Sequence, residues 1–177
     1  MSKIKSNTML ELIDATVGKI CHDLINPVGT AQMALEQINS GIDSNQALKT
    51  CLQQTIDRLE IFRSIFRISA NADHAMDLIR KYIENNKLNC TLESPSTAPC
   101  LLFFAIQKMS SKSSIAFIKN EIILNQITLR EEEIKALEGT YQEISAGTIM
   151  PYIAQLSIKK PLQIEQIEEK KWKITII

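Results

Sequence analysis

Apolar residues recur at intervals of three and four along the first forty positions of the chain. The series runs from Leu10 to Ile38, which places these side chains on one face of a helix spanning residues 8–39. Residues 39–43 then supply a glycine for a helix end and Asp for a new helix start, and the same spacing resumes over residues 44–66. The pattern predicts two long antiparallel helices joined by a short loop.

The second helix carries more apolar residues than one seam requires. Besides the main series it has a further stripe, made of Ile56, Ile61, Ile65 and Ile68. Two helices cannot hide two such stripes from water by packing on each other alone. We therefore expect residues 1–70 to form a helical hairpin that pairs with a second copy as a homodimeric four-helix bundle.

The pattern changes after residue 70, where helical spacing and strand-like alternation follow one another. This mixture predicts a second domain, residues 71–177, of α+β class. A loop is expected at 94–99, and Thr128 with Glu131 has the spacing of a helix-capping box. The expected helices are 72–86, 101–109, 128–137 and 149–158, and the expected strands are 88–92, 114–119, 121–127, 162–167 and 172–176.

Charge and composition exclude several classes of partner. Twenty Lys and Arg balance twenty Asp and Glu, so no net positive field favours nucleic acid or an anionic membrane. The longest apolar run, residues 100–106, is far short of the ~20 residues that span a bilayer, and no signal peptide is evident. Four cysteines form no CxxC pair, so we expect neither a disulfide nor a metal site. These features favour a cytoplasmic protein.

The first helix carries an unusual strip around His22. In the heptad register His22 lies farthest from the apolar seam, and Gly18, Asn26 and Gly29 share its face. Each glycine costs a helix about 1 kcal/mol relative to alanine, so two of them beside one histidine suggest the close approach of another molecule. A histidine on a helix surface has no function in most proteins, but this strip favours one.

A proline follows the histidine by five positions. Pro27 has no N–H, so it frees the carbonyl group of Asp23 from its helical hydrogen bond. Asp23 is adjacent to His22 and can orient the imidazole ring or balance its charge. Asn26 can donate an amide hydrogen bond to an anion that arrives over the ring. We therefore expect His22, Asp23 and Asn26 to form one site.

The segment Cys21-His-Asp-Leu-Ile-Asn-Pro27 resembles the phosphoacceptor box of sensor histidine kinases. Its Cys-His-Asp beginning is most similar to ChpT-type histidine phosphotransferases of alphaproteobacteria. The resemblance is specific over residues 19–37 and architectural beyond them. It implies a dimeric hairpin followed by a small α/β sandwich that resembles a degenerate kinase ATP-binding domain.

The sequence itself argues against kinase activity. A kinase-type nucleotide site needs glycine-rich loops that let the backbone approach the phosphates, together with an Asn-bearing helix for Mg²⁺. Only Gly139 and Gly147 occur in the second domain, and the helix at 101–109 has neither Asn nor Glu. We expect no ATP and no other cofactor.

The resemblance implies a phosphorelay role, in which His22 carries a phosphoryl group between receiver-domain aspartates. Asp23 and Asn26 would complete the catalytic set, while Mg²⁺ and a cationic lysine would come from the receiver. The implied partners are the receiver domain of a hybrid histidine kinase and those of response regulators. The residues expected to dock them are Gly18, Lys19, Gly29, Arg58 and Arg63.

Two alternatives stay open at this stage. The chain can be a non-catalytic dimeric adaptor or a degenerate kinase regulator that uses the same hairpin as a scaffold. A hydrolase built on Cys21, His22 and Asp23 is the other alternative, but successive helical residues point about 100° apart and do not face one another. The other histidine, His74, is expected at the surface, and Trp172 in the core.

Overall fold

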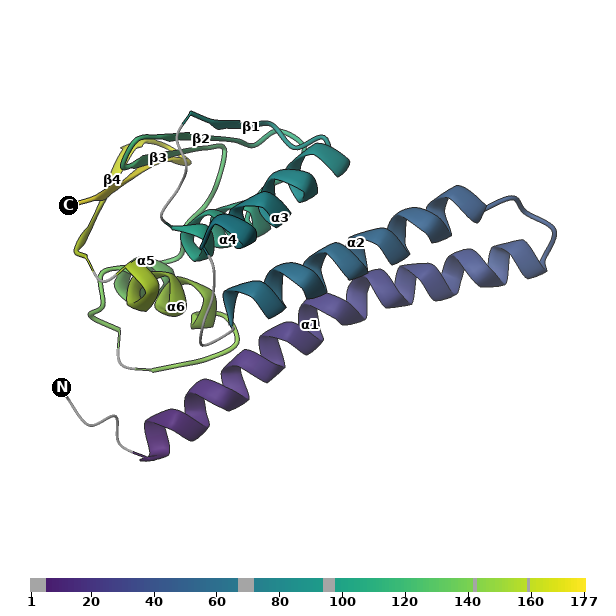
Figure 1. Ribbon diagram of the computed structural model, residues 1–177, viewed down its shortest axis with the longest axis horizontal. Helices are drawn as coiled ribbons and strands as arrows, with labels where there is room; N and C mark the ends of the chain where they lie inside the picture. The colour runs from purple at the N-terminus through teal and green to yellow at the C-terminus, as the bar shows by residue number, and fades with distance from the viewer. Residues whose placement is uncertain (1–5, 67–71, 94–97, 142, 159) are drawn as a thin grey trace.

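The computed structural model describes residues 6–66, 72–93, 98–141, 143–158 and 160–177. The chain begins with the predicted helical hairpin, α1 (Ser6–Asn39) and α2 (Asn45–Ile65), which lie side by side and antiparallel (Figure 1). Gly41 has φ +84°, a left-handed conformation that ends α1 with little strain. The backbone N–H of Asn45 donates to Asp43 Oδ1 at 3.2 Å and starts α2. The glycine predicted to end the first helix is confirmed, but the N-cap of α2 is Ser44, outside residues 39–43, and its side chain makes no capping hydrogen bond.

The face of α1 that packs within the chain is built from small residues. Ala31 and Ala34 are buried in the outer part of the hairpin, where α2 is the neighbour (Figure 1). By contrast, Leu10 and Val17, which the sequence placed at core positions, are 66% and 54% exposed. Leu12 and Ile20 pack partly buried against the core, but most of the other large apolar side chains of α1 remain exposed in the single chain.

The rest of the chain is a mixed α+β body, as predicted. Its helices are α3 (Ala72–Asn85), α4 (Pro99–Gln107), α5 (Glu131–Leu137) and α6 (Ile149–Ile158). Its strands are β1 (Cys90–Leu92), β2 (Ser114–Ile118), β3 (Glu121–Asn125), β4 (Leu162–Glu168) and β5 (Lys171–Ile176). They form one sheet in the order β1-β2-β3-β5-β4, in which β1 and β2 are parallel and the other pairs antiparallel.

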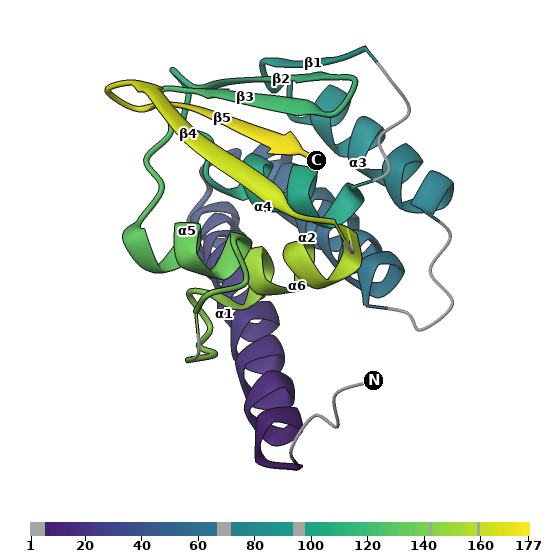
Figure 2. The ribbon, with the colours of Figure 1, turned by 90° about the vertical axis from the view of Figure 1, so that its left-hand side faces the viewer.

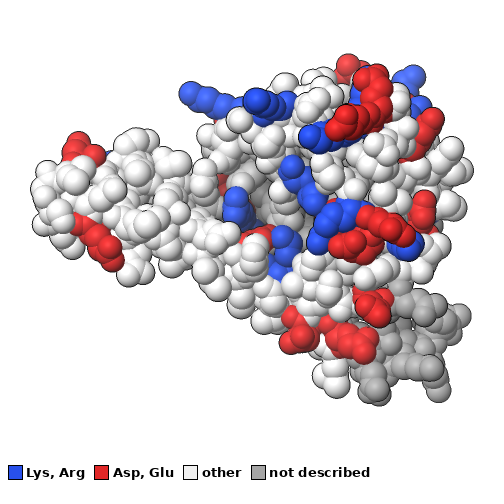
Figure 3. All heavy atoms as spheres, turned by 180° about the vertical axis from the view of Figure 1, so that it is seen from behind, with Lys and Arg blue, Asp and Glu red and all other residues white. Residues whose placement is uncertain are grey.

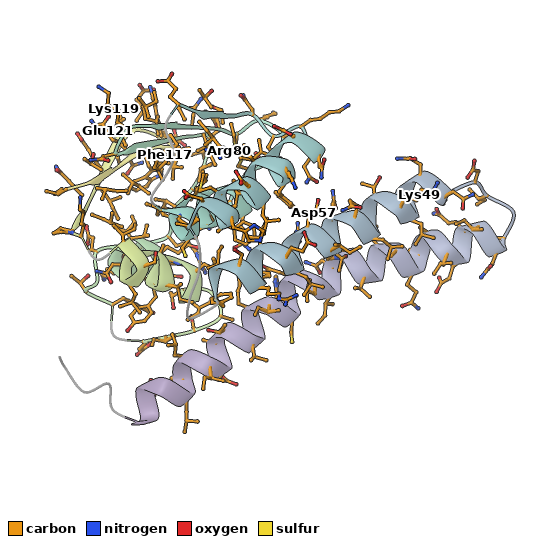
Figure 4. The ribbon with its side chains drawn as sticks, in the orientation of Figure 1. Lys49, Asp57, Arg80, Phe117, Lys119 and Glu121 are labelled. Atoms are coloured by element: carbon orange, nitrogen blue, oxygen red, sulfur yellow. The ribbon has the colours of Figure 1, made fainter. Side chains whose placement is uncertain are left out.

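The sheet has one covered face. Its strands alternate inward and outward residues, and the inward ones lie on the side of helices α3 to α6 (Figure 2). Phe117 of β2 points into this layer, whereas Lys119 and Glu121 flank the β2–β3 turn (Figure 4). Trp172 packs partly buried against the same core, in line with its predicted core position.

The hairpin and the α+β body share one hydrophobic core. Phe62 of α2 meets Phe103 of α4 edge to face with ring centroids 5.4 Å apart, and Tyr82 of α3 meets the same ring at 6.4 Å. Asp57 of α2 also faces α3, where Asn85 donates to its Oδ2 at 3.2 Å (Figure 4). The boundary predicted at residue 70 lies outside the described residues, but the core on its two sides is continuous.

Two local predictions differ from the structure. The helix predicted from Thr128 begins at Glu131, and its N-cap is Arg130, whose backbone N–H donates to Glu133 Oε2 at 2.9 Å. The capping box at Thr128 and Glu131 is therefore wrong. Residues 94–97 of the predicted loop lie outside the described residues, and Pro99 occupies the first turn of α4, where its missing N–H costs no hydrogen bond.

Candidate functional site

His22 lies in the middle of α1, where the hairpin passes the α+β body. Its side chain is 72% exposed, in agreement with the predicted surface position. The imidazole Nδ1 is 3.2 Å from Oδ1 of Asp23. An ionised carboxylate can accept a hydrogen bond but cannot donate one, so the contact favours the tautomer of His22 with its proton on Nδ1. In that tautomer Nε2 keeps its lone pair and is the nucleophilic atom.

Asp23 is buried, with 10% of its side chain exposed, and it is held from several directions. Lys19 Nζ, one helical turn earlier, donates to Oδ1 at 2.7 Å. Gln107 Nε2, at the end of α4, donates to Oδ2 at 2.7 Å. A buried carboxylate without partners is costly, and these donors compensate its loss of water.

The carbonyl group of Asp23 has a partner as well. Pro27 is buried inside α1 and offers no N–H to this oxygen, as the sequence predicted. Arg58 Nη1 of α2 donates to it instead, at 3.0 Å, while Arg58 Nε lies 3.2 Å from the hydroxyl of Tyr82. The proline defect in α1 is therefore satisfied by the neighbouring helix, and Arg58 links α1, α2 and α3.

Two clefts flank His22. One, of about 520 Å³, is lined by His22, Asn26, Arg58 and Tyr82 among others, and the second, of about 320 Å³, lies on the side of α5 and α6. Lys19, His22 and Gln107 line both clefts. Figure 3 shows a hollow between the hairpin and the body, with Lys and Arg side chains around it. An incoming group therefore reaches His22 through polar, partly cationic surroundings.

Two cations of the second cleft, Lys108 and Arg130, pair with the same buried acid, Glu133. Glu133 accepts from Lys108 Nζ at 2.9 Å and from Arg130 Nη2 at 3.0 Å. Burial alone would raise the pKa of Glu133, but the hydrogen bonds from Arg130 and Lys108 outweigh it and hold this pKa below its ordinary value. Glu133 has a structural role, because both oxygens of its carboxylate already accept hydrogen bonds from these donors.

The residues predicted to dock a partner divide into two groups. Lys19 and Arg58 make hydrogen bonds within their own chain, as described above, and a Cβ built at Gly18 would lie 3.8 Å from the Cβ of Ala146. Gly29 has no atom within 4 Å of such a Cβ, and Arg63 is exposed outside both clefts. The strip is therefore open toward Gly29 but bordered by the body at Gly18.

Asn26 is exposed and lines the same cleft as His22, so the structure brings the three predicted catalytic residues together. Two further residues of the site, Gln107 and Tyr82, were missed. No feature of the local sequence marks either residue as part of a site. Each lies on a helix distant in sequence from His22, and the spacing of apolar residues in that helix indicates only that it is buried.

The cysteines give no support to hydrolase chemistry. All four thiols are free of disulfides, and Cys21 is exposed. Burial raises the pKa of the Cys90 thiol to about 11, and that of Cys100 also lies above its ordinary value. Among the described residues, no group of three or more His, Cys, Asp or Glu is placed to hold a metal ion.

Comparison with known proteins supports the fold. No protein-family model matches the sequence, and no curated protein does. The chain is similar to a bacterial phosphotransferase whose structure is known at 1.7 Å, with a TM-score of 0.74 at 16% identity over 99% of this chain and 98% of that one. The chain therefore has a phosphotransferase-like fold. Within the described part, no helix combines the length and hydrophobicity needed to cross a membrane.

Proposed function

We propose that the chain is a histidine phosphotransferase of a phosphorelay, with His22 as the phosphoacceptor. The observation that carries this proposal is the exposed imidazole of His22, with Nδ1 3.2 Å from a buried carboxylate that is itself fully hydrogen-bonded. The similarity of the whole fold to a bacterial phosphotransferase supports it. The resemblance of residues 21–27 to the phosphoacceptor box of ChpT-type phosphotransferases supports the same function.

The reaction is an in-line displacement at phosphorus. The lone pair of His22 Nε2 attacks the phosphorus of an aspartyl phosphate, the P–O bond to the aspartate breaks, and the aspartate leaves as a carboxylate with the bonding electron pair. The ring, which keeps its proton on Nδ1, gains positive charge. Asp23 stabilises that charge across the 3.2 Å contact. The reverse reaction returns the phosphoryl group to a second receiver.

The partner supplies the remaining charges. We expect Mg²⁺ and a lysine on the receiver domain to neutralise the phosphoryl oxygens, so this chain contributes positioning and a docking surface. Asn26 can donate to a phosphoryl oxygen, and the open strip at Gly29 admits the receiver's loops. The donors and acceptors would be receiver domains of a hybrid histidine kinase and of response regulators.

A second copy of the chain completes the proposed assembly. The uncovered apolar side chains of α1 and α2 would pack in a dimeric four-helix bundle, which leaves one His22 site on each copy. The scarcity of glycine in the body leads us to expect no use of ATP. The body would then resemble a kinase ATP-binding domain in architecture only.

The test is transfer of radiolabelled phosphate from purified phosphorylated receivers to the full chain. Label should appear on the wild type and on His74→Gln, be lost by His22→Gln, and be labile in acid but stable in alkali. Incubation with labelled ATP alone should give no label. Label on His22→Gln, or self-labelling by ATP, would contradict the proposal, and receiver binding without transfer would identify the adaptor instead.

A further inference from the structure

The C-terminal body reaches the phosphoacceptor turn through one side chain. Gln107 is the last residue of α4, and its Nε2 donates to Asp23 Oδ2 at 2.7 Å across 84 positions of sequence. It lines both clefts beside His22. This contact joins the body to the carboxylate that faces the imidazole.

The two carboxylate oxygens of Asp23 have different partners. Oδ1 faces His22 and Lys19, whereas the partner of Oδ2 is Gln107. The torsion that sets the plane of a carboxylate is soft, so an aspartate does not fix its own orientation. A donor on Oδ2 keeps Oδ1 turned toward the ring. Lys19 alone cannot do this, because it binds the same oxygen as the imidazole.

Gln107 is itself anchored. The residues of α4 before it are buried without exception from Cys100 to Ile106, and Phe103 packs between Phe62 and Tyr82. The backbone of Gln107 is already fixed by this packing, so its hydrogen bond costs only the rotamer entropy of the side chain itself. The body thereby provides a rigid support for Asp23.

We propose that Gln107 is a positioning residue, which orients Asp23 so that His22 keeps its proton on Nδ1 and presents Nε2 to the phosphoryl group. This inference rests on the proposed function of His22. It gives the C-terminal body a role in the chemistry that requires no nucleotide. Gln107 touches neither the reacting atoms nor the phosphoryl group, and it acts through Asp23.

The experiment compares two variants of Gln107 with a matched control. Gln107→Met keeps the length of the side chain but removes its donor, and Gln107→Glu is nearly isosteric but turns a carboxylate toward Asp23. Gln54 lines the same cleft and donates to Asn86 Oδ1 at 2.8 Å, so Gln54→Met removes an amide that does not contact Asp23. A His74→Gln background leaves His22 as the only imidazole to observe.

The first measurement is the tautomer of His22 from the nitrogen shifts of its ring, at about pH 9, where a free imidazole is neutral. The Nδ1–H form should dominate in the wild type and in Gln54→Met. Gln107→Met should shift the ring toward Nε2–H, and Gln107→Glu should shift it further. This measurement needs no partner, so it decides the role of Gln107 even if no receiver transfers phosphate to His22.

The second measurement is the rate of transfer from a phosphorylated receiver. Mispositioning should lower the maximal rate of Gln107→Met by roughly ten- to a hundredfold and leave the half-saturating receiver concentration unchanged. A change in that concentration alone would show a docking role and overturn the inference. So would a wild-type tautomer in Gln107→Met or Gln107→Glu.

Discussion

The hairpin and the α+β body bury their apolar residues to different extents. Eleven of the fourteen large apolar side chains that are exposed in the described part of the chain belong to the hairpin. The body exposes only Leu156, Ile167 and Ile177. Isolated exposed apolar residues are ordinary, but a continuous row of them indicates an interface. The body buries nearly all of its large apolar side chains within one chain, whereas the hairpin leaves most of its own exposed, as the proposed dimer would require.

Eight of these eleven residues lie on one face of their own helix, and we call these eight the apolar stripe. It consists of Leu10, Ile13, Val17, Val28 and Leu35 on α1 with Leu52, Ile56 and Leu59 on α2. At 100° per residue, Val17, Val28 and Leu35 lie within about 20° of one another around the α1 axis. His22 lies well away from them, so a dimer formed through the stripe would leave the His22 side chain of each copy accessible.

The largest effect is expected from a charge in the apolar stripe. The proposed dimer should be lost in Val17→Asp, because a carboxylate in each copy would have to be buried without a partner. Met33→Asp is the matched control, since Met33 is 58% exposed but lies about 160° from Val17 around the helix. Light scattering should give about twice the 20.0 kDa chain mass for the control and the wild type.

A monomeric wild type at micromolar concentration would contradict this interpretation. Equal dissociation of both variants would place the interface elsewhere on α1. The body should keep its thermal unfolding transition in Val17→Asp, because its core does not include the stripe.

The second effect concerns the contact that joins α1 and α2 beside Pro27, in which Arg58 donates to the carbonyl group of Asp23. Arg58→Met should destabilise the chain by about 1–3 kcal/mol, since it leaves the buried carbonyl of Asp23 without a donor. Pro27→Ala restores a backbone N–H at this point of α1. In the Pro27→Ala background, Arg58→Met should therefore cost less, and urea unfolding of the four proteins measures the difference.

Additive effects of the two substitutions would show that Arg58 does not compensate for the proline. The cost of Arg58→Met would then come from its contact with the Tyr82 hydroxyl. Tyr82→Phe separates the two contributions, because it removes that hydroxyl and leaves the Asp23 carbonyl bonded to Arg58.

The sequence predicted the helices and strands that have one face in the core and the other exposed to water. The spacing of apolar residues located the hairpin, and the alternation in β2, β3 and β5 located the sheet. The helix at 101–109 was also predicted, but the elements that α4 packs against were not. A helix buried on all sides has no periodic face from which to infer its neighbours. For the same reason the sequence did not show that α2 and α4 share a core through Phe62 and Phe103.

The candidate site was predictable as far as its residues are local. His22, Asp23 and Pro27 lie within two helical turns, so helix geometry alone gave the exposed ring and the freed carbonyl. Gln107 and Tyr82 reach the site from other helices, and nothing in their local sequence marks them. Arg58 was expected at the surface, but its guanidinium turns inward to the carbonyl that the proline frees.

The smallest expected effect comes from substitutions of the two glycines beside His22. Gly18 borders the body, whereas Gly29 has open space around it. Gly18→Ala and Gly29→Ala should each stabilise the chain by up to about 1 kcal/mol, since both glycines are helical and the Ala146 contact at 3.8 Å is ordinary. Larger side chains should act differently. Gly18→Gln would meet Ala146 of its own chain and lower the melting temperature, whereas Gly29→Gln would extend into open space and, like Gly29→Ala, raise it slightly. Only Gly29→Gln therefore tests docking cleanly, because it should slow phosphate transfer from receivers without destabilising the chain. Wild-type transfer by a stably folded Gly29→Gln would show that this end of the strip does not contact the receiver.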